Sequence, residues 1–243
     1  NVDRGPFYRM WTGDISTDLG YLRGIEQFMW DVYDNPEWLK RLLSFMRDGI
    51  LKVHQEAEEA GDWQLCNHEN QSMPYASELK DPKANSGSVK RNELWGFLAA
   101  QEFDQMSPKH HYEFMLKYQI PILEKFGLTA YGCCEDLTHK IDIVKEIPNL
   151  RRIAVTPFAD IAKCAKKIGS DYVCSWRPNP SATVCTGFKE ENIKKIILNA
   201  MEEFEKNNCI YDICLKDVHT VQNDPDRLRK FVDIVKDVII KYL

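Results

Sequence analysis

Polar and ionisable residues follow short apolar runs of the sequence at five separate places. The five clusters are Asn67-His68-Glu69, Cys133-Cys134-Glu135-Asp136, Thr156-Pro157, Cys174-Ser175-Trp176-Arg177 and Lys216-Asp217-Val218-His219. In a barrel of alternating strands and helices, the loops that follow the strands meet on one face, and that face carries the active site. We therefore predict that these clusters bring chemically active side chains to a single rim.

Two cysteines of these clusters suggest a metal site, because each comes at the end of its own predicted strand. Thiolates from different strands can bind one tetrahedral zinc ion, with Zn–S distances of about 2.3 Å. Glu102 is our first choice for a further ligand of Cys134 and Cys174, and His219 is the second. A fourth position left open would make the metal catalytic. The alternative is that both cysteines only pack in the core.

The adjacent Cys133 complicates the choice of sulfur. Side chains alternate along a strand, so only one of Cys133 and Cys134 should face the barrel interior. We expect that residue to be Cys134, because it is nearer the rim.

The other polar residues of the rim suggest proton transfer and substrate binding. The candidate catalytic residues, which could donate or accept a proton, are His68, Glu69 and His219. The candidate substrate-binding residues are Asn67, Trp176, Arg177 and Lys216. The two cations among them suit an anionic group of a substrate. Each candidate also has a structural alternative, namely surface hydrogen bonds for the histidines and solvated ion pairs for the cations.

Helical patterns and short apolar runs alternate along the chain. Apolar residues three and four apart predict helices that begin at Asn35-Pro36, at Ser107-Pro108, near Glu190 and at Asp224-Pro225. The runs of strand length are Trp63–Cys66, Leu128–Cys133, Arg151–Val155, Asp171–Cys174 and Ile210–Leu215. Because parallel strands need crossover helices, this alternation predicts an α/β fold with a parallel sheet.

A barrel is the preferred form of this sheet. No Gly-x-Gly-x-x-Gly turn follows any of the strands, which argues against a dinucleotide-binding fold. A complete TIM (β/α)8 barrel takes about 250 residues, whereas only about five βα units are recognisable here. We therefore expect residues 1–243 to form a single TIM-type barrel domain that is truncated at its N-terminus. Exposed strand edges of an incomplete barrel predict either a homodimer or a rearranged structure.

The amino-acid composition argues against nucleic-acid and membrane partners. The chain has 32 Lys and Arg against 37 Asp and Glu and no basic stripe, which argues against a nucleic-acid partner. Its apolar runs fall short of the about 20 residues of a membrane span, and charged residues interrupt the first eleven positions, unlike a signal peptide. Several of the eight cysteines lie in apolar runs, which favours a reducing compartment. The sequence thus predicts a cytoplasmic protein with a small-molecule substrate.

Five segments, taken in order, resemble the uroporphyrinogen decarboxylase superfamily. They are Arg23-Gly24-Ile25-Glu26, Asp31 with Asp34-Asn35-Pro36-Glu37, Tyr131-Gly132-Cys133-Cys134-Glu135-Asp136, Pro148-Asn149-Leu150-Arg151-Arg152 and Tyr172-Val173-Cys174-Ser175-Trp176-Arg177-Pro178-Asn179-Pro180. The resemblance covers nearly the whole chain. It is closer to the branch of uncharacterised relatives and corrinoid-linked methyltransferases than to the decarboxylases.

Departures from the superfamily's patterns narrow what the resemblance implies. The decarboxylases carry a Gly-Asn-Leu-Asp-Pro loop where this chain has the segment from Ser175 to Pro180. Corrinoid methyltransferases of the superfamily bind zinc through a His-x-Cys pair and a later Cys, and Tyr131 stands at the histidine position. The O-demethylase methyltransferases of anaerobes use a carboxylate and two widely separated cysteines. Glu102, Cys134 and Cys174 are similar to that arrangement.

The resemblance therefore implies a zinc-dependent methyltransferase that moves a methyl group between a small methylated substrate and a corrinoid carried by a partner protein. The alternative is a metal-independent, decarboxylase-like lyase in which Arg177 and Lys216 bind substrate carboxylates. A third hypothesis is a non-catalytic barrel that only binds a ligand.

Overall fold

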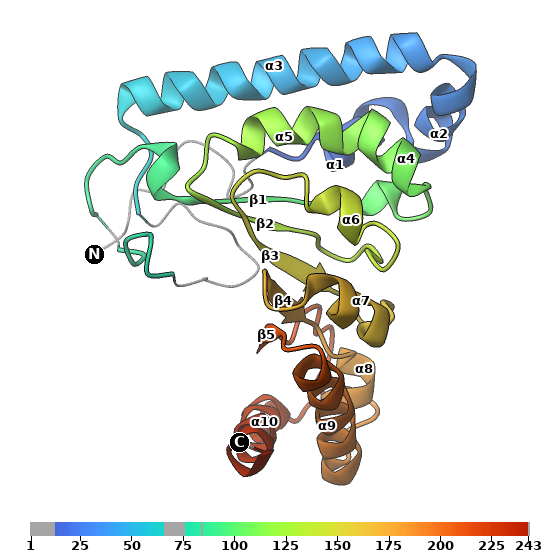
Figure 1. Ribbon diagram of the computed structural model, residues 1–243, viewed down its shortest axis with the longest axis vertical. Coiled ribbons are helices and arrows are strands. Elements are labelled where there is room, and N and C mark those ends of the chain that lie inside the picture. The colour runs from blue at the N-terminus through green and yellow to red at the C-terminus, as the bar shows by residue number, and fades with distance from the viewer. Residues whose placement is uncertain (1–12, 66–75, 84, 243) are drawn as a thin grey trace. The chain divides into compact units, whose positions relative to one another are not determined.

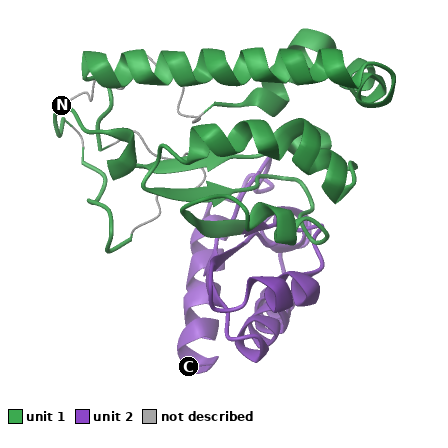
Figure 2. Ribbon diagram, turned by 45° about the horizontal axis from the view of Figure 1, so that its top comes forward, with its two compact units in different colours: residues 1–153 green, residues 154–243 purple. Residues whose placement is uncertain are grey.

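The computed structural model describes residues 13–65, 76–83 and 85–242. The chain divides into two compact units, Asn1–Ile153 and Ala154–Leu243, which Figure 2 shows in different colours. Five parallel strands, flanked by helices, form a sheet in the order β1-β2-β3-β4-β5 (Figure 1). The predicted α/β class with a parallel sheet is therefore confirmed, and the closed barrel stays a prediction.

Unit 1 begins with three helices, followed by strands that alternate with short helical segments. The elements are α1 (Ile15–Arg23), α2 (Ile25–Asp34), α3 (Pro36–Ala60), the 3-10 turn Arg91–Glu93, β1 (Trp95–Leu98), the 3-10 turn Gln101–Phe103, α4 (Pro108–His111), the π-helix Tyr112–Leu116, α5 (Lys117–Leu123), β2 (Leu128–Tyr131), α6 (Ile141–Val144) and β3 (Leu150–Val155). The last two residues of β3 belong to unit 2.

Unit 2 continues the alternation of strands and helices. Its elements are α7 (Ile161–Ile168), β4 (Val173–Trp176), α8 (Pro180–Thr183), α9 (Glu190–Lys206), β5 (Ile210–Ile213) and α10 (Asp226–Tyr242). Helices α9 and α10 pack against each other, and both are visible in the lower part of Figure 1.

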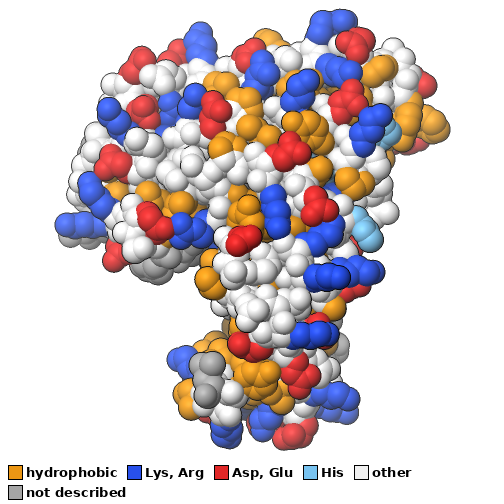
Figure 3. Space-filling view, in the orientation of Figure 1, with side chains coloured by type: hydrophobic (Ala, Val, Ile, Leu, Met, Phe, Trp, Pro, Cys, Tyr) orange, Lys and Arg blue, Asp and Glu red, His pale blue; other side chains and the backbone are white. Residues whose placement is uncertain are grey.

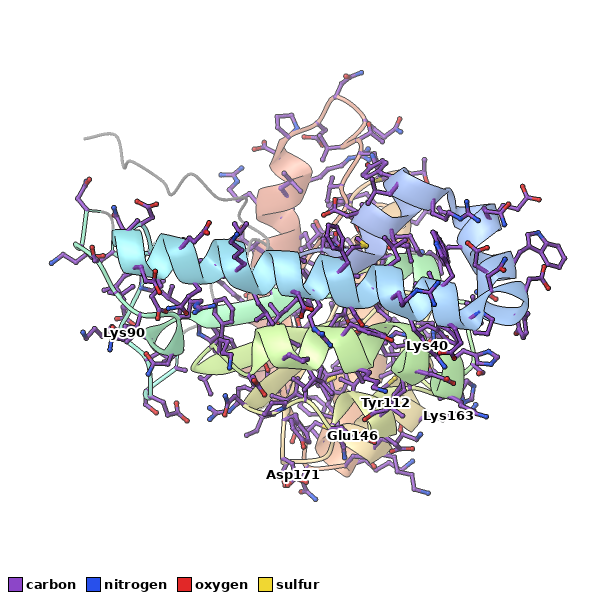
Figure 4. All side chains as sticks on the ribbon, turned by 90° about the horizontal axis from the view of Figure 1, so that it is seen from above. Lys40, Lys90, Tyr112, Glu146, Lys163 and Asp171 are labelled. Carbon is purple, nitrogen blue, oxygen red and sulfur yellow. The ribbon has the colours of Figure 1, made fainter. Side chains whose placement is uncertain are left out.

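The predicted helices form where the capping residues place them. In α3, Pro36 occupies the first turn, where its missing N–H costs nothing, and Gly61 ends the helix with φ 76°. In the next long helical segment, the Ser107 hydroxyl accepts a hydrogen bond from the His110 N–H at 3.2 Å. The ammonium of Lys40 on α3, a residue labelled in Figure 4, lies 2.8 Å from the carboxylate of Glu113, so an ion pair joins these two helical segments.

The two faces of β1 and β2 contact different parts of unit 1. On one face, apolar side chains form a buried cluster whose members are Trp95, Phe97, Ala99, Leu128, Ala130 and Cys133. The other face meets the helices. There a side chain at Gly96 would come within 2.8 Å of Phe126, so glycine lets this aromatic ring approach the strand.

The first predicted strand is wrong where the structure describes it. Trp63 and Leu65 are not in a strand, and their backbone groups bond instead to the segment that contains Ser86 and Val89. The Trp63 carbonyl accepts a hydrogen bond from the Val89 N–H at 2.9 Å, and the Leu65 N–H donates to the Ser86 hydroxyl at 3.0 Å. Cys66 lies outside the described residues. The first strand of the sheet is β1, which the sequence patterns had not predicted.

Acidic and basic side chains are interspersed over the face that Figure 3 shows. No helix among the described residues has both the length and the apolar character needed to cross a bilayer.

Candidate functional site

One buried carboxylate joins the ends of the neighbouring strands β1 and β2. Glu135 is 1% exposed, and its two oxygens accept hydrogen bonds from the Ala100 N–H and the Cys133 N–H, both at 2.8 Å. A charged acceptor makes such bonds stronger than neutral ones. The backbone just beyond the carboxyl ends of both strands is therefore held in one place.

The sulfurs of Cys133 and Cys134 lie 3.8 Å apart. Strand β2 ends at Tyr131, and Gly132 follows with φ 99°, a conformation that favours glycine. The resulting bend ends the alternation of side chains, and Cys133 packs in the buried cluster on one face of the sheet while Cys134 is exposed. The two residues therefore differ in exposure although their sulfurs are close, and which of them faces the site stays a prediction.

The spacing of the two sulfurs fits a tetrahedral metal ion. Two thiolates bound to one zinc ion, each at about 2.3 Å, are about 3.8 Å apart. Within residues 13–65, 76–83 and 85–242, no three side chains of His, Cys, Asp or Glu converge closely enough to hold a metal. The described residues thus supply a sulfur pair, and the set of Glu102, Cys134 and Cys174 stays a prediction.

Glu102 follows β1 and is held by helix α1. Its carboxylate accepts hydrogen bonds from the Ser16 hydroxyl at 2.5 Å and the Thr17 hydroxyl at 2.9 Å. A carboxylate has about four acceptor positions, so these two bonds leave capacity for a ligand. The sequence had suggested Glu102 as a metal ligand but had not predicted its partners on α1.

A wide cavity of about 1130 Å³ opens between α1 and α3. Its lining is mainly apolar and includes Tyr21, Phe45 and Ile50, with Thr17 beside Glu102 and Gln101 in the 3-10 turn that follows β1. The volume is slightly above the about 300–1,000 Å³ of most small-molecule sites. The sequence missed this cavity, because the apolar stripe of α3 reads as a face that packs in the core.

Cys174 lies inside β4 rather than at its end, because the strand extends to Trp176. The Cys174 side chain is fully buried, and this burial, together with the nearby thiols of Cys209 and Cys164, raises its pKa. Forming the thiolate that zinc requires is therefore costly at this position. The Ser175 hydroxyl, on the other face of the strand, donates to the Asp212 carboxylate of β5 at 3.0 Å.

The other predicted rim residues of unit 2 have varied surroundings. Trp176 is buried with its ring centroid 6.0 Å from that of Phe204 on α9, and Arg177 is also buried. The Lys216 ammonium lies 3.3 Å from the Asp217 carboxylate, and His219 is exposed in the loop after β5. The remaining predicted residues, which lie outside the described part of the chain, are Asn67, His68 and Glu69.

The candidate features of unit 1 are therefore a sulfur pair with the buried Glu135 just beyond the carboxyl ends of β1 and β2, and an apolar cavity between α1 and α3 with the carboxylate of Glu102 beside it. Comparisons of the chain with protein-family models, with curated proteins and with solved structures find no match in any of the three.

Proposed function

We propose that this chain is a zinc-dependent methyltransferase that moves a methyl group between a small methylated substrate and a corrinoid carried by a partner protein. The proposal places it in the corrinoid-linked branch of the superfamily that its motifs resemble, on a TIM-type barrel. The observation that carries it is the sulfur pair, Cys133 and Cys134, 3.8 Å apart at the carboxyl end of β2.

In this proposal Cys133 joins Cys134 as a zinc ligand. Zinc bound there supplies a Lewis acid that polarises the heteroatom carrying the methyl group. The Glu135 carboxylate holds the Cys133 N–H and thereby keeps the two sulfurs at their spacing. Preorganised ligands of this kind bind a metal without the cost of ordering the loop.

The proposed substrate site is the cavity between α1 and α3. Gln101, which lines it, comes just after β1, and the sulfur pair comes just after the adjacent parallel strand β2. The proposal takes both features to serve the same edge of the sheet. Apolar walls suit a small methylated compound, and Glu102, held by Ser16 and Thr17, offers a hydrogen-bond acceptor beside the cavity.

Metal content tests this function first. The purified chain is expected to hold about one zinc ion per molecule, by elemental analysis, and to lose it in Cys133→Ser and Cys134→Ser. Cys214→Ser, which changes a half-buried thiol of unit 2, is the matched control and should keep its zinc. Cys174→Ser decides whether the originally predicted second sulfur also binds.

An activity assay follows from the metal analysis. Zinc-loaded protein should methylate reduced cobalamin with a methylated donor, seen as a change in its visible spectrum, and the two serine variants should not. A metal-free protein that keeps its fold would reject the proposal. Release of carbon dioxide from a carboxylated substrate by such a protein would favour the lyase instead.

A further inference from the structure

Cys133 and Cys134 form a dithiol that is already assembled. Every cysteine that the structure describes carries a thiol rather than a disulfide, and these two have their sulfurs 3.8 Å apart. The bend at Gly132 and the bond from the Cys133 N–H to Glu135 fix the backbone on which both side chains stand. A bridging atom would therefore meet both sulfurs without rearrangement of the loop.

A direct disulfide fits this pair poorly. The Cα atoms of adjacent residues are about 3.8 Å apart across a trans peptide bond, whereas disulfides usually join Cα atoms about 4.4–6.8 Å apart. Oxidation would also have to bring the two sulfurs to about 2.05 Å against the fixed backbone. An atom that bonds to both sulfurs and keeps them apart avoids this strain.

The pair offers two sulfurs at a spacing that one bridging atom can span. Trivalent arsenic bonds strongly to sulfur, and when it carries one organic substituent it needs two sulfurs. We propose that Cys133 and Cys134 form a binding site for monosubstituted trivalent arsenicals.

The reaction balances without an oxidant. An arsenoxide, R–As=O, condenses with the two thiols, forming two As–S bonds and breaking both bonds between arsenic and oxygen. The two thiol hydrogens leave with the oxygen as one molecule of water, and arsenic stays trivalent throughout. Cys134 is exposed and forms the first bond, and the buried Cys133 closes the ring.

The experiment uses phenylarsine oxide with the full chain, both as purified and after metal removal with a chelator. Native mass spectrometry is expected to show one phenylarsenic group in place of two thiol hydrogens, removed again by a small dithiol. Cys133→Ser and Cys134→Ser each leave one sulfur of the pair, so the second, intramolecular As–S bond cannot form. Binding of the arsenical should therefore weaken at least about 100-fold. Cys174→Ser and Cys214→Ser should bind like the wild type.

Two results would overturn the inference: no adduct on the metal-free wild type, or an undiminished adduct on Cys133→Ser. Because Cys134 is exposed, Cys134→Ala serves as a second variant that keeps the fold, checked by circular dichroism. Arsenical binding by a chain that never holds zinc would reject the methyltransferase proposal alone. If the pair binds zinc but the metal-free chain forms no arsenical adduct, only the arsenical site would be rejected.

Discussion

The carboxylate of Glu135 accepts a hydrogen bond from the N–H of Cys133, two residues before it, and holds the N–H of Ala100 with its other oxygen. Fully buried glutamates are rare in proteins unless their carboxylate has partners such as these. The loops that follow β1 and β2 therefore share one anchor, and the spacing of the sulfur pair depends on it.

Glu135→Gln should destabilise the chain. The amide keeps one acceptor oxygen, but its NH2 group then faces a backbone N–H, which leaves a buried donor unsatisfied. The expected loss in the free energy of unfolding is about 1–3 kcal/mol, measured by urea denaturation. Glu124→Gln changes an exposed carboxylate and should stay within about 0.5 kcal/mol of the wild type. Equal denaturation midpoints for the two variants would contradict the role of Glu135.

Tyr131→Phe should reduce stability and leave metal binding intact. The Tyr131 hydroxyl donates to the Gln119 side-chain oxygen at 2.8 Å and lies 2.9 Å from His111 Nε2. Gln119 in turn donates to the Ala99 carbonyl at 2.7 Å. Losing the hydroxyl leaves buried polar groups unsatisfied, at a cost of about 1–3 kcal/mol. Tyr21→Phe, at an exposed tyrosine, is the control. If Tyr131→Phe also lost zinc, the sulfur pair would depend on contacts other than those described.

His54 should make the chain less stable in mild acid. Burial, and to a smaller extent Arg91, lowers the pKa of His54 to about 4. Between about pH 6.5 and that value the unfolded chain binds a proton that the folded chain does not, so the free energy of unfolding falls as the pH is lowered through this window. His54→Phe removes this term. Relative to the wild type, the variant should gain about 3 kcal/mol between pH 7 and pH 4.

Thermal or urea unfolding at a series of pH values measures this difference. His139→Gln, at an exposed histidine, should follow the wild type across the series. A constant difference between His54→Phe and the wild type at every pH would show that His54 is not held neutral by burial.

Asp31→Asn tests one of the motifs behind the superfamily resemblance. The buried Asp31 carboxylate lies 2.6 Å from Arg23 Nε and also accepts hydrogen bonds from Gln27 and Asn35. The Arg23 guanidinium holds the pKa of Asp31 below its usual range. The asparagine should cost about 1–3 kcal/mol in urea denaturation. Asp48→Asn, in an exposed pair with Arg47, should cost less than about 1 kcal/mol. A loss as large as that of Asp31→Asn would contradict the difference expected from burial.

Capping residues made the long helices predictable from sequence. Helix α3 begins at Asn35-Pro36 because proline suits a first helical turn. It ends at Gly61 because glycine adopts positive φ without strain. The parallel sheet followed from the alternation of strands and helices. Strand β1 was missed because it is only four residues long and contains Gly96, a residue type that is depleted in strands.

The candidate site was predictable only in part. The sequence placed Cys134 at a strand end and proposed Glu102 as a ligand, but it could not show that Gly132 turns the chain and brings Cys133 to the same place. Cys174 was expected at the end of its strand, whereas β4 continues past it to Trp176. Strand ends are set by hydrogen bonds to neighbouring strands, which a single sequence does not display.

The zinc content of Cys133→Ser measures the central claim most directly, because Cys133 is the ligand that the arrangement of the two sulfurs adds. The account predicts about one zinc ion per wild-type chain, almost none in Cys133→Ser or Cys134→Ser, and undiminished zinc in Cys214→Ser. Zinc retained in full by a folded Cys133→Ser protein would contradict it.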